Sequence, residues 1–240
     1  MRSMSLTHVV YPPACLLCRQ RLQTTDALFC ETCEGSLHPV QPPCCQRCGV
    51  ELVGAYDAQF CCQRCREHPL AFEQACAPFA YLETAREAVQ AFKYHGRRRV
   101  GLWLAAQMAH RAAYCLPLAE LERVVPVPMH WLKARFRGSD PVALLARTVA
   151  DLLLLPYTPT LLQRTRWTPT QTRLTASQRF RNVREAFHAR DPIPSGATAL
   201  LVDDVLTSGA TADACSRALK AAGAARVFVL TAACALPRHP

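Results

Sequence analysis

The sequence predicts an α/β fold, a parallel sheet flanked by helices, with a small Cys-rich domain at its N-terminal side. The first observation is an apolar run over 199–202 that leads into two adjacent acids, a short loop and a helical pattern ending at Gly223. A continuous apolar run of this kind is typical of a strand buried on both faces of a parallel sheet. The second observation is that ten of the 14 cysteines lie between Cys15 and Cys65. The chain therefore combines two differently built parts.

Four Cys-x-x-Cys pairs organise the N-terminal part. They are Cys15/Cys18, Cys30/Cys33, Cys45/Cys48 and Cys62/Cys65. Each pair can hold a metal ion through two thiolates, and two pairs complete the tetrahedral Cys₄ site that structural zinc prefers. Eight such ligands predict two structural zinc ions. Their binding would supply the folding free energy that so small a segment cannot obtain from its own core.

The arrangement of these ligands has alternatives. Cys44 and Cys61 each adjoin a presumed ligand and could replace it, and the pairs could combine in sequence order or interleave. A disulfide framework needs an oxidising compartment, but the first 13 residues show no secretory signal. We therefore expect a zinc-binding Cys-rich domain over 1–70 and an α/β domain over 71–240, in a cytoplasmic protein.

Apolar periodicity after Pro78 predicts alternating strands and helices, following a short connection over 66–76. The expected strands are 79–82, 123–128, 160–164, 199–202 and 226–231. The expected helices are 84–94, 100–114, 141–154, 176–182 and 212–222, the third capped by Ser139 or Asp140 with Pro141 in its first turn. No run of about 18 apolar residues occurs, so we expect no membrane span.

Asp203 and Asp204 follow the apolar run, and at the carboxyl end of a parallel strand they lie where open α/β sheets bind ligands. The backbone and hydroxyl groups after them, together with a helix N-terminus, form a phosphate cradle. The cradle comprises Thr207, Ser208, Gly209, Ala210 and Thr211. The acids can accept hydrogen bonds from sugar hydroxyls or hold a metal that carries phosphate. The alternative is a strand-end acid pair in another doubly wound fold, such as a receiver domain.

The segment from Asp203 to Thr211 resembles the phosphoribosyl pyrophosphate (PRPP) motif of type I phosphoribosyltransferases. That resemblance implies a phosphoribosyltransferase-like sheet in which the two acids hold the ribose hydroxyls and the loop binds the 5′-phosphate. Magnesium would be bound together with PRPP. No catalytic side chain is singled out, because the transfer passes through an oxocarbenium-like state that a protein stabilises by position and charge.

Basic residues outnumber acidic ones, giving a formal net charge of +10, and only three of the 28 basic residues are lysines. From Lys133 to Arg190 eleven basic residues face three acidic ones. Arginine favours bidentate contact with phosphates, and such an excess suits a pyrophosphate or polynucleotide. Arg135, Arg137 and Arg166 are the candidates for this contact. A GC-rich genome would give the same composition without any such role.

The motifs in order resemble the ComF family of competence proteins (also GntX-like), in which a zinc module precedes a phosphoribosyltransferase-like domain. Besides the cysteine pairs and the acid-pair loop, the resemblance rests on Phe92-Lys93-Tyr94-x-Gly96, Val125-Pro126-Val127-Pro128, Arg135-x-Arg137-Gly138, Arg164-x-Arg166-x-Thr168-x-x-Gln171-x-x-Leu174, Arg179-x-x-Asn182 and Ala186-Phe187. Where the family usually reads Phe-Asn-Gln, this chain has Ser139-Asp140-Pro141.

The resemblance implies a cytoplasmic protein of natural transformation that handles incoming single-stranded DNA, with the competence helicase machinery as a partner. Its α/β domain would bind PRPP. The alternative is an active phosphoribosyltransferase of nucleotide metabolism that uses PRPP and an unknown acceptor. A ligand-sensing regulator is a third possibility.

Overall fold

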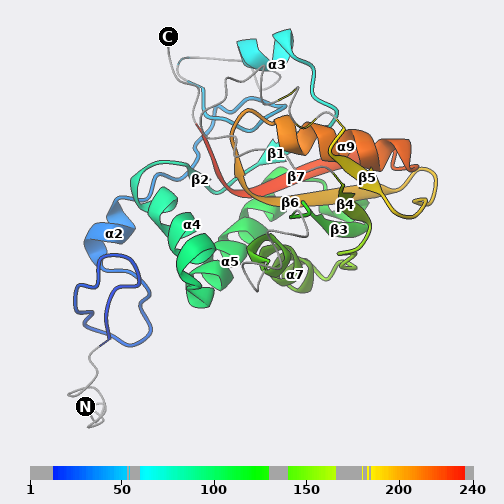
Figure 1. Ribbon diagram of the computed structural model, residues 1–240. Coiled ribbons are helices and arrows are strands. Elements are labelled where there is room, and N and C mark those ends of the chain that lie inside the picture. Colours follow the sequence, from blue (N-terminus) through cyan, green and yellow to red (C-terminus); the bar gives the residue numbers. More distant parts are fainter. Residues whose placement is uncertain are drawn as a thin grey trace.

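The computed structural model describes residues 13–52, 54, 60–129, 140–165, 180, 183 and 185–235. Its parallel sheet flanked by helices confirms the predicted fold class (Figure 1). The Cys-rich part holds two short helices, α2 (Glu31–Gly35) and α3 (Gln63–Glu67). Among the described residues, no helix combines the length and the apolarity that crossing a membrane requires.

The α/β part begins with two short strands and continues with alternating helices and strands. Its strands are β1 (Gln74–Cys76), β2 (Phe79–Ala80), β3 (Arg123–Pro126), β4 (Leu162–Arg164), β5 (Phe187–Ala189), β6 (Thr198–Leu206) and β7 (Arg226–Cys234). Its helices are α4 (Glu83–His95), α5 (Arg98–Cys115), the 3₁₀ turn η1 (Leu118–Glu120), α7 (Pro141–Leu153) and α9 (Ala210–Ala221).

The main sheet has the strand order β1-β7-β6-β3, with β2 also paired to β7, and every pairing in it is parallel. The pairing of β6 with β7 is the longest, running from Thr198 opposite Arg226 to Leu206 opposite Cys234. Strand β3 lies along the other side of β6, opposite Ala199 to Val202. Because all these strands run the same way, their carboxyl ends meet at one edge of the sheet.

Helices cover both faces of this sheet, as Figure 1 shows for α9 on one face and α4, α5 and α7 on the other. Side chains alternate along β6, so Leu200 and Val202 join the core under α5 and α7, whereas Ala199 and Leu201 join the core under α9. The four residues are fully buried. The apolar run that the sequence places before the acids is thus the centre of the fold.

The ends of two helices follow from local chemistry. Asp140 caps α7, because its Oδ1 accepts hydrogen bonds from the amides of Val142 at 3.0 Å and Ala143 at 3.1 Å, with Pro141 in the first turn. The acid at which this chain departs from the family pattern therefore has a structural role. Helix α4 ends at His95, and the next residue, Gly96, caps it with a left-handed φ of 62° that favours glycine.

The two halves of the Cys-rich part belong to different hydrophobic cores, and the first half packs against helices α4 and α5 rather than on the sheet itself (Figure 1). Cys15 and Phe29, from the first half, belong to the core under α4 and α5, where the Phe29 ring meets Trp103 edge-on at 4.8 Å. Val50 and Phe72, from the second half and the segment after it, belong to the core under α9. No local sequence pattern indicates this division.

Several elements differ from the sequence-based expectation. The prediction of an irregular connection over 66–76 was wrong for its last three residues. These form β1 and pair with Phe228 to Leu230 of β7. Strand β5 was not expected, and it pairs antiparallel with β4. Strand β6 continues to Leu206, so both acids lie within it rather than after it. The helix expected over 176–182 lies outside the described residues except for Phe180.

Candidate functional site

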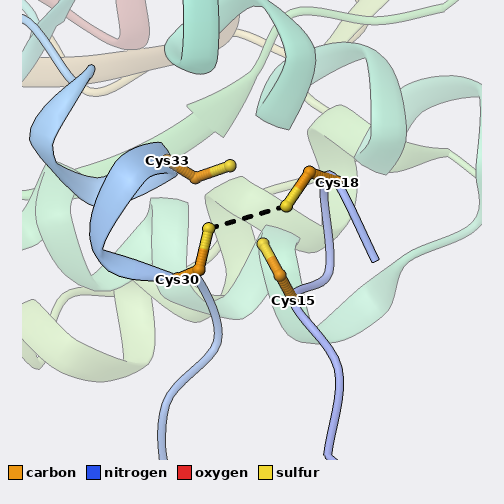
Figure 2. A group of neighbouring side chains, drawn as sticks. All are labelled: Cys15, Cys18, Cys30 and Cys33. Carbon is orange, nitrogen blue, oxygen red and sulfur yellow. Dashed lines mark hydrogen bonds between the residues drawn. The ribbon is translucent and has the colours of Figure 1, made fainter. Parts of the chain in front are cut away.

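The first cysteine cluster consists of Cys15, Cys18, Cys30 and Cys33, whose Sγ atoms all lie within 4.8 Å of one another. Figure 2 shows the four side chains converging on a common centre. The Sγ atoms of Cys18 and Cys30 are 3.5 Å apart. In a tetrahedral zinc site with Zn–S bonds of about 2.3 Å, sulfur atoms are separated by about 3.8 Å. The cluster therefore has the dimensions that zinc needs.

The second cluster consists of Cys45, Cys48, Cys62 and Cys65, within the same 4.8 Å limit, and all four residues are buried. The Sγ atoms of Cys48 and Cys62 are 3.8 Å apart. The amide of Cys62 donates a hydrogen bond to the Cys45 Sγ at 3.3 Å, an interaction that orients and stabilises a thiolate. Four buried thiols that face one another at this distance fit the tetrahedral Cys₄ coordination of zinc.

The clusters answer the two questions that the sequence left open. The pairs combine in sequence order, and Cys44 and Cys61 belong to neither cluster. The Cys44 thiol instead donates a hydrogen bond to the carbonyl of Gln41 at 3.1 Å.

Both clusters are built in the same way. In each half, the first pair lies on a tight turn closed by an antiparallel bridge, Ala14 to Arg21 and Cys44 to Glu51. The second pair lies at the start of a five-residue helix, α2 or α3. A left-handed residue follows the first pair, and in the second half it is Gly49 with φ 67°. There a Cβ would approach the Ala75 carbonyl oxygen to 2.3 Å, so only glycine lets this turn pack against β1.

Asp203 and Asp204 lie near the carboxyl end of β6, where the sequence analysis placed them. Successive side chains of a strand point to opposite faces. Asp204 accordingly meets Lys93 of α4 on one face, with 2.5 Å between Lys93 Nζ and Asp204 Oδ2. Asp203 points to the face of α9, where its charge acts on the thiol of Cys215. The two carboxyl groups therefore have different surroundings.

The Lys93–Asp204 ion pair is largely removed from solvent, with side-chain exposures of 25% for Lys93 and 8% for Asp204. Burial by itself lowers the pKa of Lys93, but the charge of Asp204 and its hydrogen bond raise the pKa above its ordinary value. The ion pair neutralises one of the two acids. It also fixes the end of α4 beside the carboxyl edge of the sheet.

Within the part of the chain that the structure describes, Asp203 forms no ion pair of this kind. Burial, followed by the nearby charge of Asp204, raises the pKa of the Asp203 carboxyl from 3.8 to about 8. Its Oδ1 accepts a hydrogen bond from the Asp204 amide at 2.8 Å. A carboxyl group with such a pKa changes protonation near neutral pH, so it can accept or release a proton as a ligand binds.

The loop after the acids turns sharply into α9. Gly209 has a left-handed φ of 81° and precedes the first residue of the helix, Ala210, without a side-chain cap of its own. The amide of Ala210 approaches the Ser208 Oγ at 3.4 Å, a long contact. The loop therefore ends at the N-terminus of α9, where the positive end of the helix dipole lies.

The structure places the acids and the loop from Thr207 to Thr211 at one edge of the sheet and the eight cysteines in two clusters. Arg135, Arg137 and Arg166 lie outside the described residues. The sequence analysis did not identify Lys93 as the partner of Asp204, although Lys93 lies in the quoted Phe92-Lys93-Tyr94 motif. It also missed Arg64, which lies between Cys62 and Cys65 and donates a hydrogen bond to the Thr207 carbonyl at 3.0 Å.

Comparison with protein families supports the metal sites. Residues 6–66 match the model of the Double zinc ribbon domain. This match spans both cysteine clusters, and together with their geometry it supports structural zinc in the N-terminal part.

Curated relatives resemble the chain over nearly its whole length. It is 28% identical over 224 residues to Competence protein F of Haemophilus influenzae, covering 90% of this chain and 94% of the relative. It is 29% identical over 227 residues to DNA utilization protein YhgH of Salmonella typhi, with 91% and 95% covered. These names confirm the resemblance to competence proteins that the motifs predict.

Two solved structures resemble part of the α/β domain. Glutamine PRPP amidotransferase of Bacillus subtilis, complexed with ADP and GMP, is 23% identical with a TM-score of 0.37 and covers 54% of this chain. A structure of the allosteric regulatory enzyme of purine biosynthesis is 22% identical, with the same TM-score and 55% of this chain covered. The chain covers 25% of the length of each of these two proteins, and so partial a likeness supports no conclusion about function.

We predict about two zinc ions per chain, on the arithmetic of two Cys₄ sites. Cys45→Ser should lower the content to about one, because three thiolates hold zinc less firmly than four. Cys44→Ser, its sequence neighbour outside the cluster, should keep both ions. Metal analysis of purified protein measures this. Zinc-free protein with disulfides found by mass spectrometry would overturn the assignment.

We predict that Asp203→Asn stabilises the protein increasingly as pH rises. The folded-state pKa of about 8 exceeds the unfolded value, so the folded state binds the extra proton and its stability falls as pH rises towards 8. The variant lacks this pH-dependent destabilisation, so its melting temperature should exceed that of wild type more at pH 8.5 than at pH 6.

Thermal melts of both proteins across this range measure the difference. Asp191→Asn, at an exposed loop position, is the matched control and should show no such trend. If the difference in melting temperature between Asp203→Asn and wild type stays constant or decreases as pH rises, the raised pKa of Asp203 is contradicted.

Proposed function

We propose that this chain is a cytoplasmic DNA-handling protein of natural transformation whose α/β domain binds PRPP with Mg²⁺ at the segment from Asp203 to Thr211. The observation that carries the ligand is the acid pair near the carboxyl end of β6, followed after Leu206 by the Gly209 turn into α9. A ligand that carries sugar hydroxyls and a phosphate close together needs these two kinds of partner side by side.

Each part of the ligand has a partner of matching chemistry. Ribose hydroxyls donate hydrogen bonds, and carboxylates accept them. The 5′-phosphate needs donors and a positive potential, which the loop amides, hydroxyls and helix dipole supply. Magnesium would bind the pyrophosphate oxygens, because it prefers phosphate and water ligands. Lys93, held 2.5 Å from Asp204, is a cation close enough to share its hydrogen bonds with the ligand.

The DNA-handling part rests on two supports. Relatives similar over some nine-tenths of the chain are named Competence protein F and DNA utilization protein. The segment from Lys133 to Arg190 carries eleven basic residues against three acidic ones, which suits a nucleic-acid backbone. Single-stranded DNA and the competence helicase machinery are the partners that this role requires.

Phosphoribosyl transfer is the second candidate. It is favoured by the position of Asp203 near the carboxyl end of β6, where burial raises the pKa of its carboxyl group to about 8. In that reaction an acceptor nucleophile forms a bond to ribose C1 while the bond from C1 to pyrophosphate breaks and Mg²⁺-pyrophosphate leaves. Asp203 could take the proton that the acceptor loses. Pyrophosphate release from PRPP that depends on an added acceptor separates this candidate from simple binding.

We predict that Asp203→Asn and Asp204→Asn each weaken PRPP binding about tenfold or more, since each replaces a charged acceptor of hydroxyl hydrogen bonds. Isothermal titration calorimetry in the presence of Mg²⁺ measures the affinity. Asp151→Asn, at an exposed position of α7, should bind as wild type does. PRPP affinity that persists in both acid variants would rule out this site.

We predict that single-stranded DNA binding is electrostatic and tolerant of sequence. Affinity should fall steeply with salt, and Arg135→Ala with Arg137→Ala should flatten the slope of log K against log salt by about one for each phosphate that is no longer neutralised. Fluorescence anisotropy with labelled oligonucleotides measures the slope. Arg86→Ala, at an exposed position of α4 outside the basic segment, should leave it unchanged. An affinity independent of salt would contradict the prediction.

A further inference from the structure

The half of the Cys-rich part that carries Cys45, Cys48, Cys62 and Cys65 is called the second zinc ribbon here, and it contacts the loop of the proposed PRPP site directly. Arg64 lies in α3 between two residues of the second cysteine cluster, Cys62 and Cys65. Its Nη1 donates a hydrogen bond to the carbonyl oxygen of Thr207 at 3.0 Å, across 143 positions of sequence. The ribbon on the α9 face therefore reaches the first residue of the loop.

Two further interactions bind the same segments together. The amide of Ala71 donates a hydrogen bond to Oδ1 of Asp213, in the first turn of α9, at 2.7 Å. The Leu70 side chain covers Gly209, since a Cβ built there would meet both Leu70 methyl groups at 3.6 Å. Asp213 and Gly209 are buried beneath this segment. The residues that follow the cluster thus pack along the loop and the start of its helix.

Zinc bound at the second cluster would hold Arg64 in place. A helix of five residues, such as α3, is not stable by itself, because too few hydrogen bonds offset the cost of its nucleation. Both of its flanking cysteines belong to the cluster, so zinc would fix the two ends of the turn that carries Arg64. The guanidinium also lies close enough to Cys48 for the charge of that thiol to act on it. A Cys₄ zinc site carries net negative charge, which a guanidinium complements.

The hydrogen bond to Thr207 has a directional consequence. The Thr207 carbonyl and the Ser208 amide belong to one planar trans peptide, so they point in opposite directions. When Arg64 holds the Thr207 carbonyl towards the ribbon, the Ser208 N–H is turned away from the ribbon. The same bond polarises the peptide and strengthens its N–H as a donor.

We propose that the second zinc ribbon orients the phosphate-binding loop and that Arg64 is the positioning residue through which it acts. This inference rests on the proposed PRPP site for its ligand, but the orientation of the loop is a property of the free protein. Arg64 touches no ligand atom itself. Its effect reaches the ligand through the Thr207–Ser208 peptide.

The test compares Arg64→Ala, Arg64→Lys and a matched control, Arg66→Ala, an exposed arginine of the same short helix. Arg64→Ala should keep both zinc ions but weaken PRPP binding about tenfold. Amide hydrogen exchange over 207–211 should become faster, while exchange over 199–202 of β6 stays slow. Arg64→Lys, which still offers a charged donor, should recover part of both effects, and Arg66→Ala should behave as wild type.

Two outcomes would overturn the inference: unchanged loop exchange in Arg64→Ala, or faster exchange throughout β6 and α9, which marks a general loss of stability. The exchange measurement needs no ligand, so it decides the role of Arg64 even if wild-type protein fails to bind PRPP. That failure would instead remove the proposed function. If Arg64→Ala does not fold, Arg64→Gln, which keeps a neutral donor, takes its place with the same two readouts.

Discussion

The parallel pairing of β6 with β7 holds the whole α/β domain in register. It extends from Thr198 opposite Arg226 to Leu206 opposite Cys234, and it keeps β6 between β7 and β3. Burial of Leu200 and Leu201 on the two faces gives the helices their packing surfaces. The same pairing carries Asp203 and Asp204 to the edge of the sheet, where the loop to α9 begins.

The features that were predictable from sequence are those written in local patterns. The apolar run before the acids predicts the central strand, the spacing of the cysteines predicts two Cys₄ groups, and Ser139-Asp140 before Pro141 predicts a cap of α7, which the structure assigns to Asp140. Interactions between distant segments leave no local pattern. The Lys93–Asp204 ion pair, the Arg64–Thr207 hydrogen bond and the division of the Cys-rich part between two hydrophobic cores are of this kind. Strand β1 has only three residues, too few for a periodic signal.

The acid pair illustrates why the sequence alone misjudges electrostatics. Alternation along the strand places the two adjacent carboxyl groups on different faces and so gives them different surroundings. Asp204 is neutralised by Lys93, whereas burial, together with the nearby charge of Asp204, raises the pKa of Asp203 to about 8. The free site thus tolerates two acids at the end of a buried strand. The proposed ligand would donate hydroxyl hydrogen bonds to both carboxyl groups. These would replace the hydrogen bond from Lys93 to Asp204 and the proton on Asp203.

The edge formed by Asp203, Asp204 and the loop to Thr211 is proposed to bind a phosphoribosyl ligand, and a crystal structure of the protein with PRPP and Mg²⁺ is the decisive measurement. We predict ribose hydroxyls within hydrogen-bond distance of both carboxylates and the 5′-phosphate against the amides of Ser208 to Thr211. PRPP bound elsewhere, for instance beside the arginines at the start of α5, would contradict the proposal.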